Sequence, residues 1–164
     1  MVAEKSEPRE FSSPPCFAHE FEDKLTNSET VDVLMELLEA ARAGTRIAKE
    51  IRIQVKKLGE ASVLLDLIDQ IHRDEVFHCS MLGRAIESLG GKPSTEIGAL
   101  YEKSMSIGDP GGRLAVLNRG QGWVSRKINQ LVPQLRDTQL IEFLKKMRRT
   151  HDLNIEKTNI ALER

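Results

Sequence analysis

The sequence predicts an all-α protein built from four long helices. In four stretches, apolar residues recur every three or four positions, which is the spacing that gives a helix one inward face. No stretch of comparable length alternates between apolar and polar residues as a half-buried strand would. Short connections join the first stretch to the second and the third to the fourth, whereas about 20 residues separate the second from the third.

The first helix is predicted to follow Ser28 and to end at about Gly59. Its inward positions hold apolar or small residues: Val31, Leu34, Leu38, Ala41, Thr45 and Ala48. Glycine is common just past the end of a helix, so Gly59 suits the expected stop.

Residues 1–29 are predicted to form an extended N-terminal arm, which leaves residues 30–164 for the helical domain. The arm is polar and contains Ser-Pro-Pro, a combination typical of extended chain. It carries Cys16 and His19, residue types that bind metals, but these two alone do not make a site. We expect the arm to pack onto the helical body or onto a neighbouring subunit.

The second helix is predicted from Leu64 to Leu89, closed by two glycines, and it carries two polar residues on its inward face. The segment DEVFH places Glu75 and His78 three positions apart, so their side chains are neighbours on one face. A lone buried carboxylate costs several kcal/mol unless it is protonated, paired or bound to a metal. The pair therefore offers one oxygen and one nitrogen to a metal ion in the core.

The third helix is predicted to start after Pro110-Gly111-Gly112 and to stop before Pro133, with Gln121 on its inward face. The fourth is predicted from about Asp137 to Ala161, with His151 inward. The connection before the third helix, KPSTEIGALYEKSMSIGDPGG, is long enough to travel the length of a bundle. A short helix is predicted within it, over residues 95–106.

Two interpretations of the inward polar residues are open. In the first, Glu75, His78 and His151 hold a single iron, manganese or zinc ion, with Gln121 or water completing the coordination. In the second, the core is metal-free, His78 hydrogen-bonds to Glu75 and Gln121 to His151, and the protein acts by association with other proteins. Both interpretations require the four inward faces to meet at one level.

The four-helix pattern, the long middle connection and the Glu-x-x-His of DEVFH together resemble the ferritin-like di-iron carboxylate superfamily, and within it a small bacterial branch of unknown function. The resemblance implies a four-helix bundle with a long crossover between the second and third helices. The superfamily's site takes a Glu from two helices and a Glu-x-x-His from the other two. Glu75 and His78 match, whereas Ala41, Gln121 and Arg148 stand where glutamates are expected. The resemblance thus implies a degenerate site for one metal ion.

Gly120 and Gly122 flank Gln121 inside the third helix, where each glycine costs about 1 kcal/mol relative to alanine. This cost predicts either a close helix–helix approach or a cavity beside Gln121 and Trp123, open to a small-molecule ligand. The functional assignment stays between a metal-binding protein, including an oxidoreductase, and a non-catalytic bundle.

The composition excludes several classes of protein. The chain is 40% hydrophobic and 30% charged, with a formal net charge of -1, which gives no indication of nucleic-acid binding. Its polar start does not fit a secretory signal, and no apolar run is long enough to span a bilayer. Two cysteines are too few for a disulfide framework. We expect a cytoplasmic protein that forms a homo-oligomer, most simply a dimer.

Overall fold

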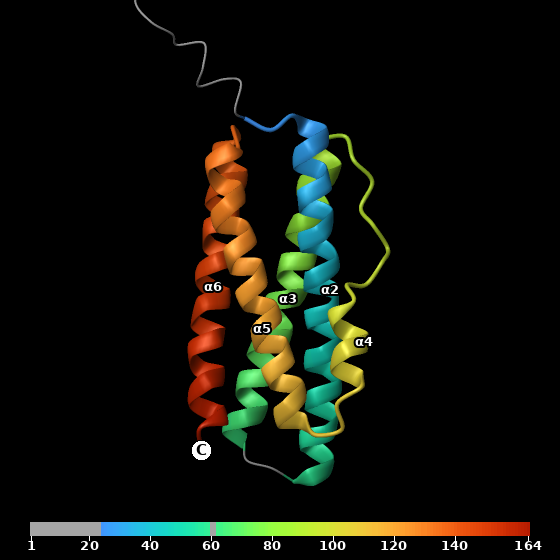
Figure 1. The fold of residues 1–164 in the computed structure, drawn as a ribbon, viewed down its shortest axis with the longest axis vertical. Coiled ribbons are helices and arrows are strands. Elements are labelled where there is room, and N and C mark those ends of the chain that lie inside the picture. Colours follow the sequence, from blue (N-terminus) through green and yellow to red (C-terminus); the bar gives the residue numbers. More distant parts are fainter. Residues whose placement is uncertain (1–23, 60–61) are drawn as a thin grey trace, which may run out of the picture.

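The computed structural model describes residues 24–59 and 62–164, and this part of the chain is helical, with no strand. Four long helices lie side by side (Figure 1): α2 (Asn27–Leu58), α3 (Ser62–Ser88), α5 (Pro110–Leu131) and α6 (Thr138–Leu162). Two short elements complete it: α4 (Leu100–Met105) and the 3-10 helix η1 (Val132–Gln134). The all-α prediction is confirmed. Most of the predicted arm, including Cys16 and His19, lies outside the described residues.

The start of α2 lies earlier than predicted. Thr26, rather than Ser28, is the N-cap: its hydroxyl accepts from the Glu29 amide at 3.2 Å, and its own amide donates to Glu29 Oε2 at 2.8 Å. This reciprocal capping box satisfies two amide groups that the first turn leaves without helical partners. Gly59 follows the last turn with a positive φ of 67°, as predicted for the C-terminal end.

The path of the chain can be followed in Figure 1. From the end of α3 the connection returns along the length of the molecule, passing beside α2, and α5 then begins near the end where α3 began. Consequently α3 and α5 run in the same direction, while α2 and α6 run in the opposite one. In the order of the chain, α2 packs against α3 and α5 packs against α6, and α2 also contacts α5.

Within the connection, α4 is shorter than the predicted helix over 95–106, because the preceding residues bond to α2 instead. The Gly98 amide donates to the Glu39 carbonyl at 2.9 Å, and the Ser94 hydroxyl donates to the Glu39 carboxylate at 2.7 Å. Arg42 donates to the carbonyls of Ser94 and Glu96. These bonds hold residues 94–98 against α2 in a non-helical conformation.

The core consists of two apolar clusters. The first includes Leu34, Leu38, Ala41, Leu82, Ile86, Val124, Ile128, Leu144 and Met147. The second includes Ile47, Ile51, Val55, Ile68, Ile71, Leu114 and Leu117. Along α3, Glu75 and His78 fall between Ile71 of the second cluster and Leu82 of the first. Along α5, Gln121 falls between the two clusters in the same way. A buried polar layer therefore separates the two apolar clusters.

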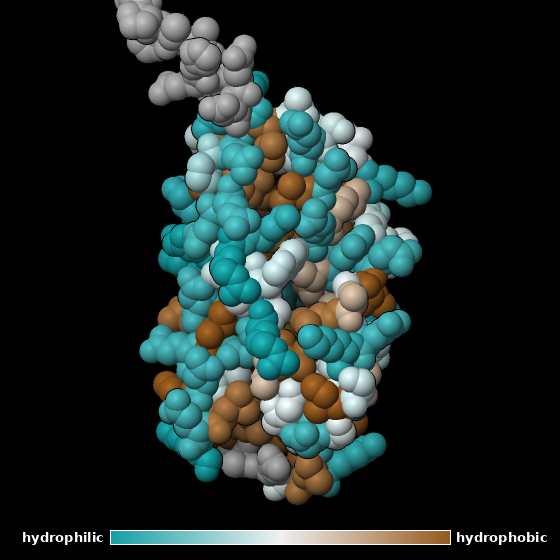
Figure 2. Space-filling view, viewed as in Figure 1, coloured by the Kyte–Doolittle hydropathy of each residue, from teal (hydrophilic) through white to brown (hydrophobic). Residues whose placement is uncertain are grey.

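The exposed large apolar side chains of the described residues include Phe77, Trp123 and Leu153. Figure 2 shows one face of the molecule, on which hydrophilic residues predominate and apolar residues form several patches between them. None of the described helices combines the length and the apolar character that crossing a membrane requires.

Candidate metal centre

The polar layer contains three metal-binding side chains that converge from two helices. Glu75 and His78 of α3 and His151 of α6 are 3%, 3% and 1% exposed. One ligand atom from each lies within 4.8 Å of the others, and no second group of this kind occurs within residues 24–59 and 62–164. Atoms in neighbouring positions around one ion, each bound at about 2.1 Å, lie about 3.0–3.4 Å apart, so closure on an ion needs shifts of up to about 1.5 Å.

His151 is oriented by a backbone hydrogen bond. Its Nδ1 atom lies 2.8 Å from the Met147 carbonyl oxygen, which can only accept, so Nδ1 carries a proton. The other nitrogen, Nε2, lies 3.3 Å from Oε1 of Glu75. In neutral His151, Nε2 is an acceptor facing another acceptor. A cation bound to these two atoms removes the repulsion between them. The cation can be a proton or a metal ion.

His78 does not make the hydrogen bond expected from the metal-free interpretation. Its Nδ1 atom lies 3.9 Å from Oε2 of Glu75, beyond hydrogen-bonding distance, and both atoms are buried without a hydrogen-bond partner. The imidazole rings of His78 and His151 stack with their centroids 4.9 Å apart. Two stacked rings and one carboxylate thus place nitrogen and oxygen lone pairs around one buried point.

The charges of this cluster are strongly coupled. Burial opposes ionisation of Glu75 and is the largest single effect, but His151 and His78 together outweigh it and lower the pKa of Glu75 to about 2. Burial also opposes protonation of His151, yet the Glu75 carboxylate and the hydrogen bond to Met147 raise its pKa above 6.5. In the absence of a metal, both shifts therefore favour an ion pair between the Glu75 carboxylate and a protonated His151.

Gly44 of α2 faces the Glu75 carboxylate, a feature that the sequence interpretation missed. A Cβ atom at Gly44 would lie 2.9 Å from Cδ of Glu75, which is closer than Cβ atoms approach other side-chain atoms in proteins. The predicted α2 position at this level was Ala41, which is buried but belongs to the first apolar cluster. The sequence did contain a signal, which is the presence of a glycine inside a long helix. A glycine destabilises a helix relative to alanine, so it is expected there only where another group must approach closely.

Gln121 is buried at the level of the cluster, as predicted, but its predicted hydrogen bond to His151 is not formed. It is 2% exposed, and neither its amide nitrogen nor its amide oxygen has a partner. Next to the cluster, Asn154 of α6 donates to Asp74 of α3 at 3.0 Å, and Gln70 donates to the same carboxylate at 2.8 Å. Asp74 is thus occupied in joining α3 to α6.

The carboxylates that a di-iron site would need are absent from the cluster. Glu36 and Glu39 of α2 bond elsewhere, to Lys127 at 2.9 Å and to Ser94 at 2.7 Å. Arg148, which stands where the superfamily has a glutamate, donates to Asn129 at 2.5 Å. Cys79 of α3 lies apart from the cluster, and burial raises the pKa of its thiol. One carboxylate supports one metal ion rather than two.

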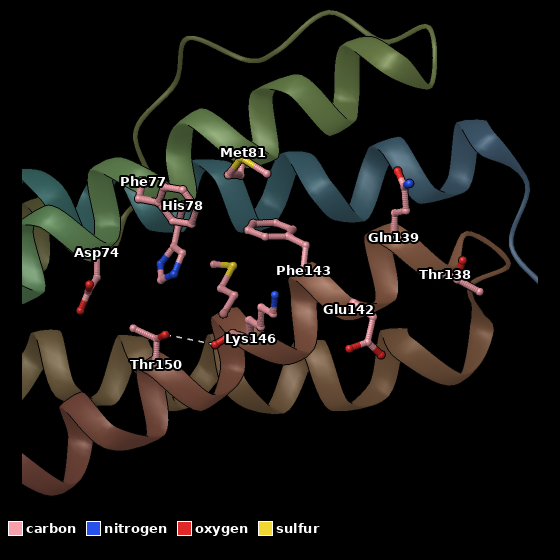
Figure 3. A pocket seen from close by; sticks show the side chains of 11 residues that line it. Asp74, Phe77, His78, Met81, Thr138, Gln139, Glu142, Phe143, Lys146 and Thr150 are labelled. Carbon is pink, nitrogen blue, oxygen red and sulfur yellow. Dashed lines mark hydrogen bonds between the residues drawn. The ribbon is translucent and has the colours of Figure 1, made fainter.

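Cavities reach the cluster from two sides. One, of about 530 Å³, lies between α2, α4 and α5 and extends to Glu75 and Gln121. The other, of about 640 Å³, lies between α3 and α6 and extends to His78. Figure 3 shows His78 projecting from α3 toward α6, with Phe77 and Met81 of α3 and Phe143 of α6 beside it. Small molecules therefore have two approaches to the buried residues.

The comparisons with known proteins give a family without an assigned activity. No curated protein and no solved structure is significantly similar to the chain. The family described as Domain of unknown function (DUF6306) matches residues 28–160, which include all four long helices almost in full. The chain therefore belongs to the DUF6306 family.

Proposed function

We propose that the protein is a ferritin-like bundle whose core holds one metal ion, bound by Glu75, His78 and His151. Two His and one carboxylate with open positions form the ligand set of mononuclear non-haem iron(II) sites, and zinc and manganese accept similar ligands. Where the bound ion is iron, it would supply redox chemistry, and oxidation of a small molecule by dioxygen is the activity that fits.

The observation that carries this proposal is the set of facing acceptors. Nε2 of His151 and Oε1 of Glu75 are 3.3 Å apart, and Oε2 of Glu75 and Nδ1 of His78 are buried without partners. Buried polar atoms are normally hydrogen-bonded, so the two atoms without partners, beside a contact that itself needs a cation, call for an explanation. A metal ion accepts all of these lone pairs at once. The Nδ1–H bond from His151 to Met147 matches the backbone bonds that orient metal-binding histidines.

The ferritin-like assignment rests on the direction of the helices. Parallel α3 and α5, joined by a connection that travels the length of the molecule, fit the single long crossover of ferritin-like bundles. The Glu-x-x-His on α3 matches one part of the ligand set of that superfamily.

The test is metal analysis of protein purified without an affinity tag. We expect close to one equivalent of iron, manganese or zinc, lost in Glu75→Ala and retained in Glu87→Ala, which changes an exposed glutamate of the same helix. Metal-free protein whose stability is unchanged by all three ions would contradict the proposal.

The second candidate is a metal-free bundle that acts by association. The ion pair between Glu75 and protonated His151 favours it, because this pair neutralises the core without a metal. The same metal analysis separates the two candidates.

A further inference from the structure

The cavity between α2, α4 and α5 has a buried inner end and an exposed mouth. Glu75 and Gln121 lie at the inner end, whereas Lys103 and Arg119 are exposed. Between them the wall is largely apolar and includes Leu100, Leu117 and Val124. Apolar walls with a few placed polar groups are typical of small-molecule sites.

Three glycines line this cavity. At Gly120 a Cβ atom would lie 2.2 Å from Leu100 Cδ2, and at Gly98 it would lie 3.0 Å from the Glu39 carbonyl oxygen. At Gly44 it would meet the Glu75 carboxylate. Larger side chains here would have to displace the wall or the carboxylate, so the shape of the cavity depends on these positions being glycine.

Gln121 gives the cavity a specific polar group. Its amide is 2% exposed and lines the cavity, and both its nitrogen and its oxygen lack hydrogen-bond partners. Leaving such a group unpaired is unfavourable, so a ligand that accepts from Nε2 would gain the missing bond. The orphan amide is the observation that points to a ligand.

The charge of the centre selects the class of ligand, a step that rests on the proposed function. A divalent ion with neutral His78 and His151 and ionised Glu75 leaves one positive charge buried. Buried charge is unfavourable unless it is compensated, and a monoanion bound to the ion would compensate it. A carboxylate also offers the oxygen that the Gln121 amide lacks.

The charges at the mouth agree with an anionic ligand. Glu36 is paired with Lys127 at 2.9 Å, and Glu39 accepts from Ser94 at 2.7 Å. Lys103 and Arg119 have no ion-pair partner among the described residues. Exposed cations near an opening attract anions to it.

We propose that this cavity binds an amphipathic monocarboxylate. Its carboxylate coordinates the metal ion held by Glu75, His78 and His151 and accepts a hydrogen bond from Gln121 Nε2. Its apolar body lies along Leu100 toward the mouth. This ligand is either the substrate of the proposed metal centre or a molecule that binds where the substrate binds.

The experiment uses the fluorescence of Trp123, which lines the cavity and is the single tryptophan of the chain. The full chain, loaded with one equivalent of zinc, is titrated with octanoate and with octanol and octylamine as neutral and cationic analogues. We expect octanoate to bind about tenfold or more tightly than either analogue, and this preference to disappear when the metal is removed.

Two variants locate the ligand. Gln121→Leu should weaken octanoate binding about tenfold without loss of zinc, whereas Gln139→Leu, which changes an amide of the opposite cavity, should leave it unchanged. Gly120→Ala should also weaken binding, because its Cβ pushes Leu100 from its place in the wall.

The outcomes separate this inference from the proposed function. A chain that takes up zinc but binds octanoate no better than octanol overturns the inference and leaves the metal centre standing. A chain that takes up no metal overturns both. Octanoate binding that Gln121→Leu leaves unchanged places the ligand elsewhere and also overturns the inference.

Discussion

Nε2 of His151 lies 3.3 Å from Oε1 of Glu75, and this contact joins α6 to α3 in the middle of the core. Each residue is nearly inaccessible to solvent, so loss of one partner leaves the other buried. The contact therefore links the stability of the fold to the charge of two side chains, and its consequences can be measured.

Removing the carboxylate should destabilise the metal-free protein. Glu75→Ala leaves His151 buried opposite a cavity, and loss of one partner of a buried pair typically costs about 3–5 kcal/mol. We expect a decrease of about 3 kcal/mol in the free energy of unfolding, measured with urea in the presence of a chelator. Glu87→Ala, on the exposed face of the same helix, should change it by less than about 0.5 kcal/mol. Equal effects of the two substitutions would contradict a buried pair.

The stability of the metal-free protein should depend on pH in a window set by the same pair. The pKa of Glu75 falls from 4.5 to about 2 on folding, so its contribution is complete above pH 4.5 and is lost as the pH falls toward 2. The pKa of His151 is raised above 6.5, so its contribution is complete below pH 6.5 and is lost as the pH rises through the raised value.

Both contributions are therefore present together between pH 4.5 and 6.5. Urea unfolding at several pH values, with a chelator present, should show this maximum in the wild type. Glu75→Gln keeps the size of the side chain and removes its charge, so the profile should flatten. A profile that Glu75→Gln leaves unchanged would mean that other groups set the pH dependence.

Gly44→Ala should disturb the cluster although it adds only one methyl group. The new Cβ would lie 2.9 Å from Glu75 Cδ and would push the carboxylate from its place. Overpacking costs about 1–3 kcal/mol, which outweighs the gain of about 1 kcal/mol from replacing a helical glycine. We expect lower stability and a reduced metal content, measured by urea unfolding and metal analysis.

Gly83→Ala is the matched control for that substitution. Gly83 is also within a helix, but its Cβ would meet only Pro93 Cγ, at 4.0 Å. It should stabilise the protein by up to about 1 kcal/mol through helix propensity alone. If Gly44→Ala were stabilised as Gly83→Ala is, the Glu75 carboxylate would have to move at no cost in free energy, which would contradict the close packing described above.

The start of α2 should depend on Thr26 rather than on Ser28. Thr26→Ala removes the hydroxyl that accepts from Glu29 and should cost about 1 kcal/mol in the free energy of unfolding. Ser28 lies within the first turn and is exposed, so Ser28→Ala should have an effect close to zero. Thermal or urea unfolding of the two variants distinguishes these cap positions.

Much of the fold could be predicted from the sequence because periodicity determines which residues face inward. The inward stripes placed Glu75, His78, Gln121 and His151 in the core, and all four are buried. The predicted stops at Gly59 and Gly90 were close because both adopt a positive φ. Such features depend on neighbours within one helix, which a single stretch of sequence contains.

Other features depend on contacts between segments and were not predictable from local pattern. The length of α4 is limited by hydrogen bonds from residues 94–98 to α2. The role of Gly44 depends on how α2 and α3 align along their axes, since the absence of a side chain carries no periodic signal. The predicted ferritin-like relationship, the dimer and the cytoplasmic location stay predictions.

The polar layer between the two apolar clusters has a consequence for the motion of the molecule. Each half of the helical domain has its own hydrophobic cluster, and the layer interrupts the buried apolar contacts that resist local opening. Amide protons of the helices near the layer should therefore exchange with deuterium sooner than those in either half. An ion bound by two helices would join the halves, and its occupancy would be visible as slower exchange of amide protons in all four long helices.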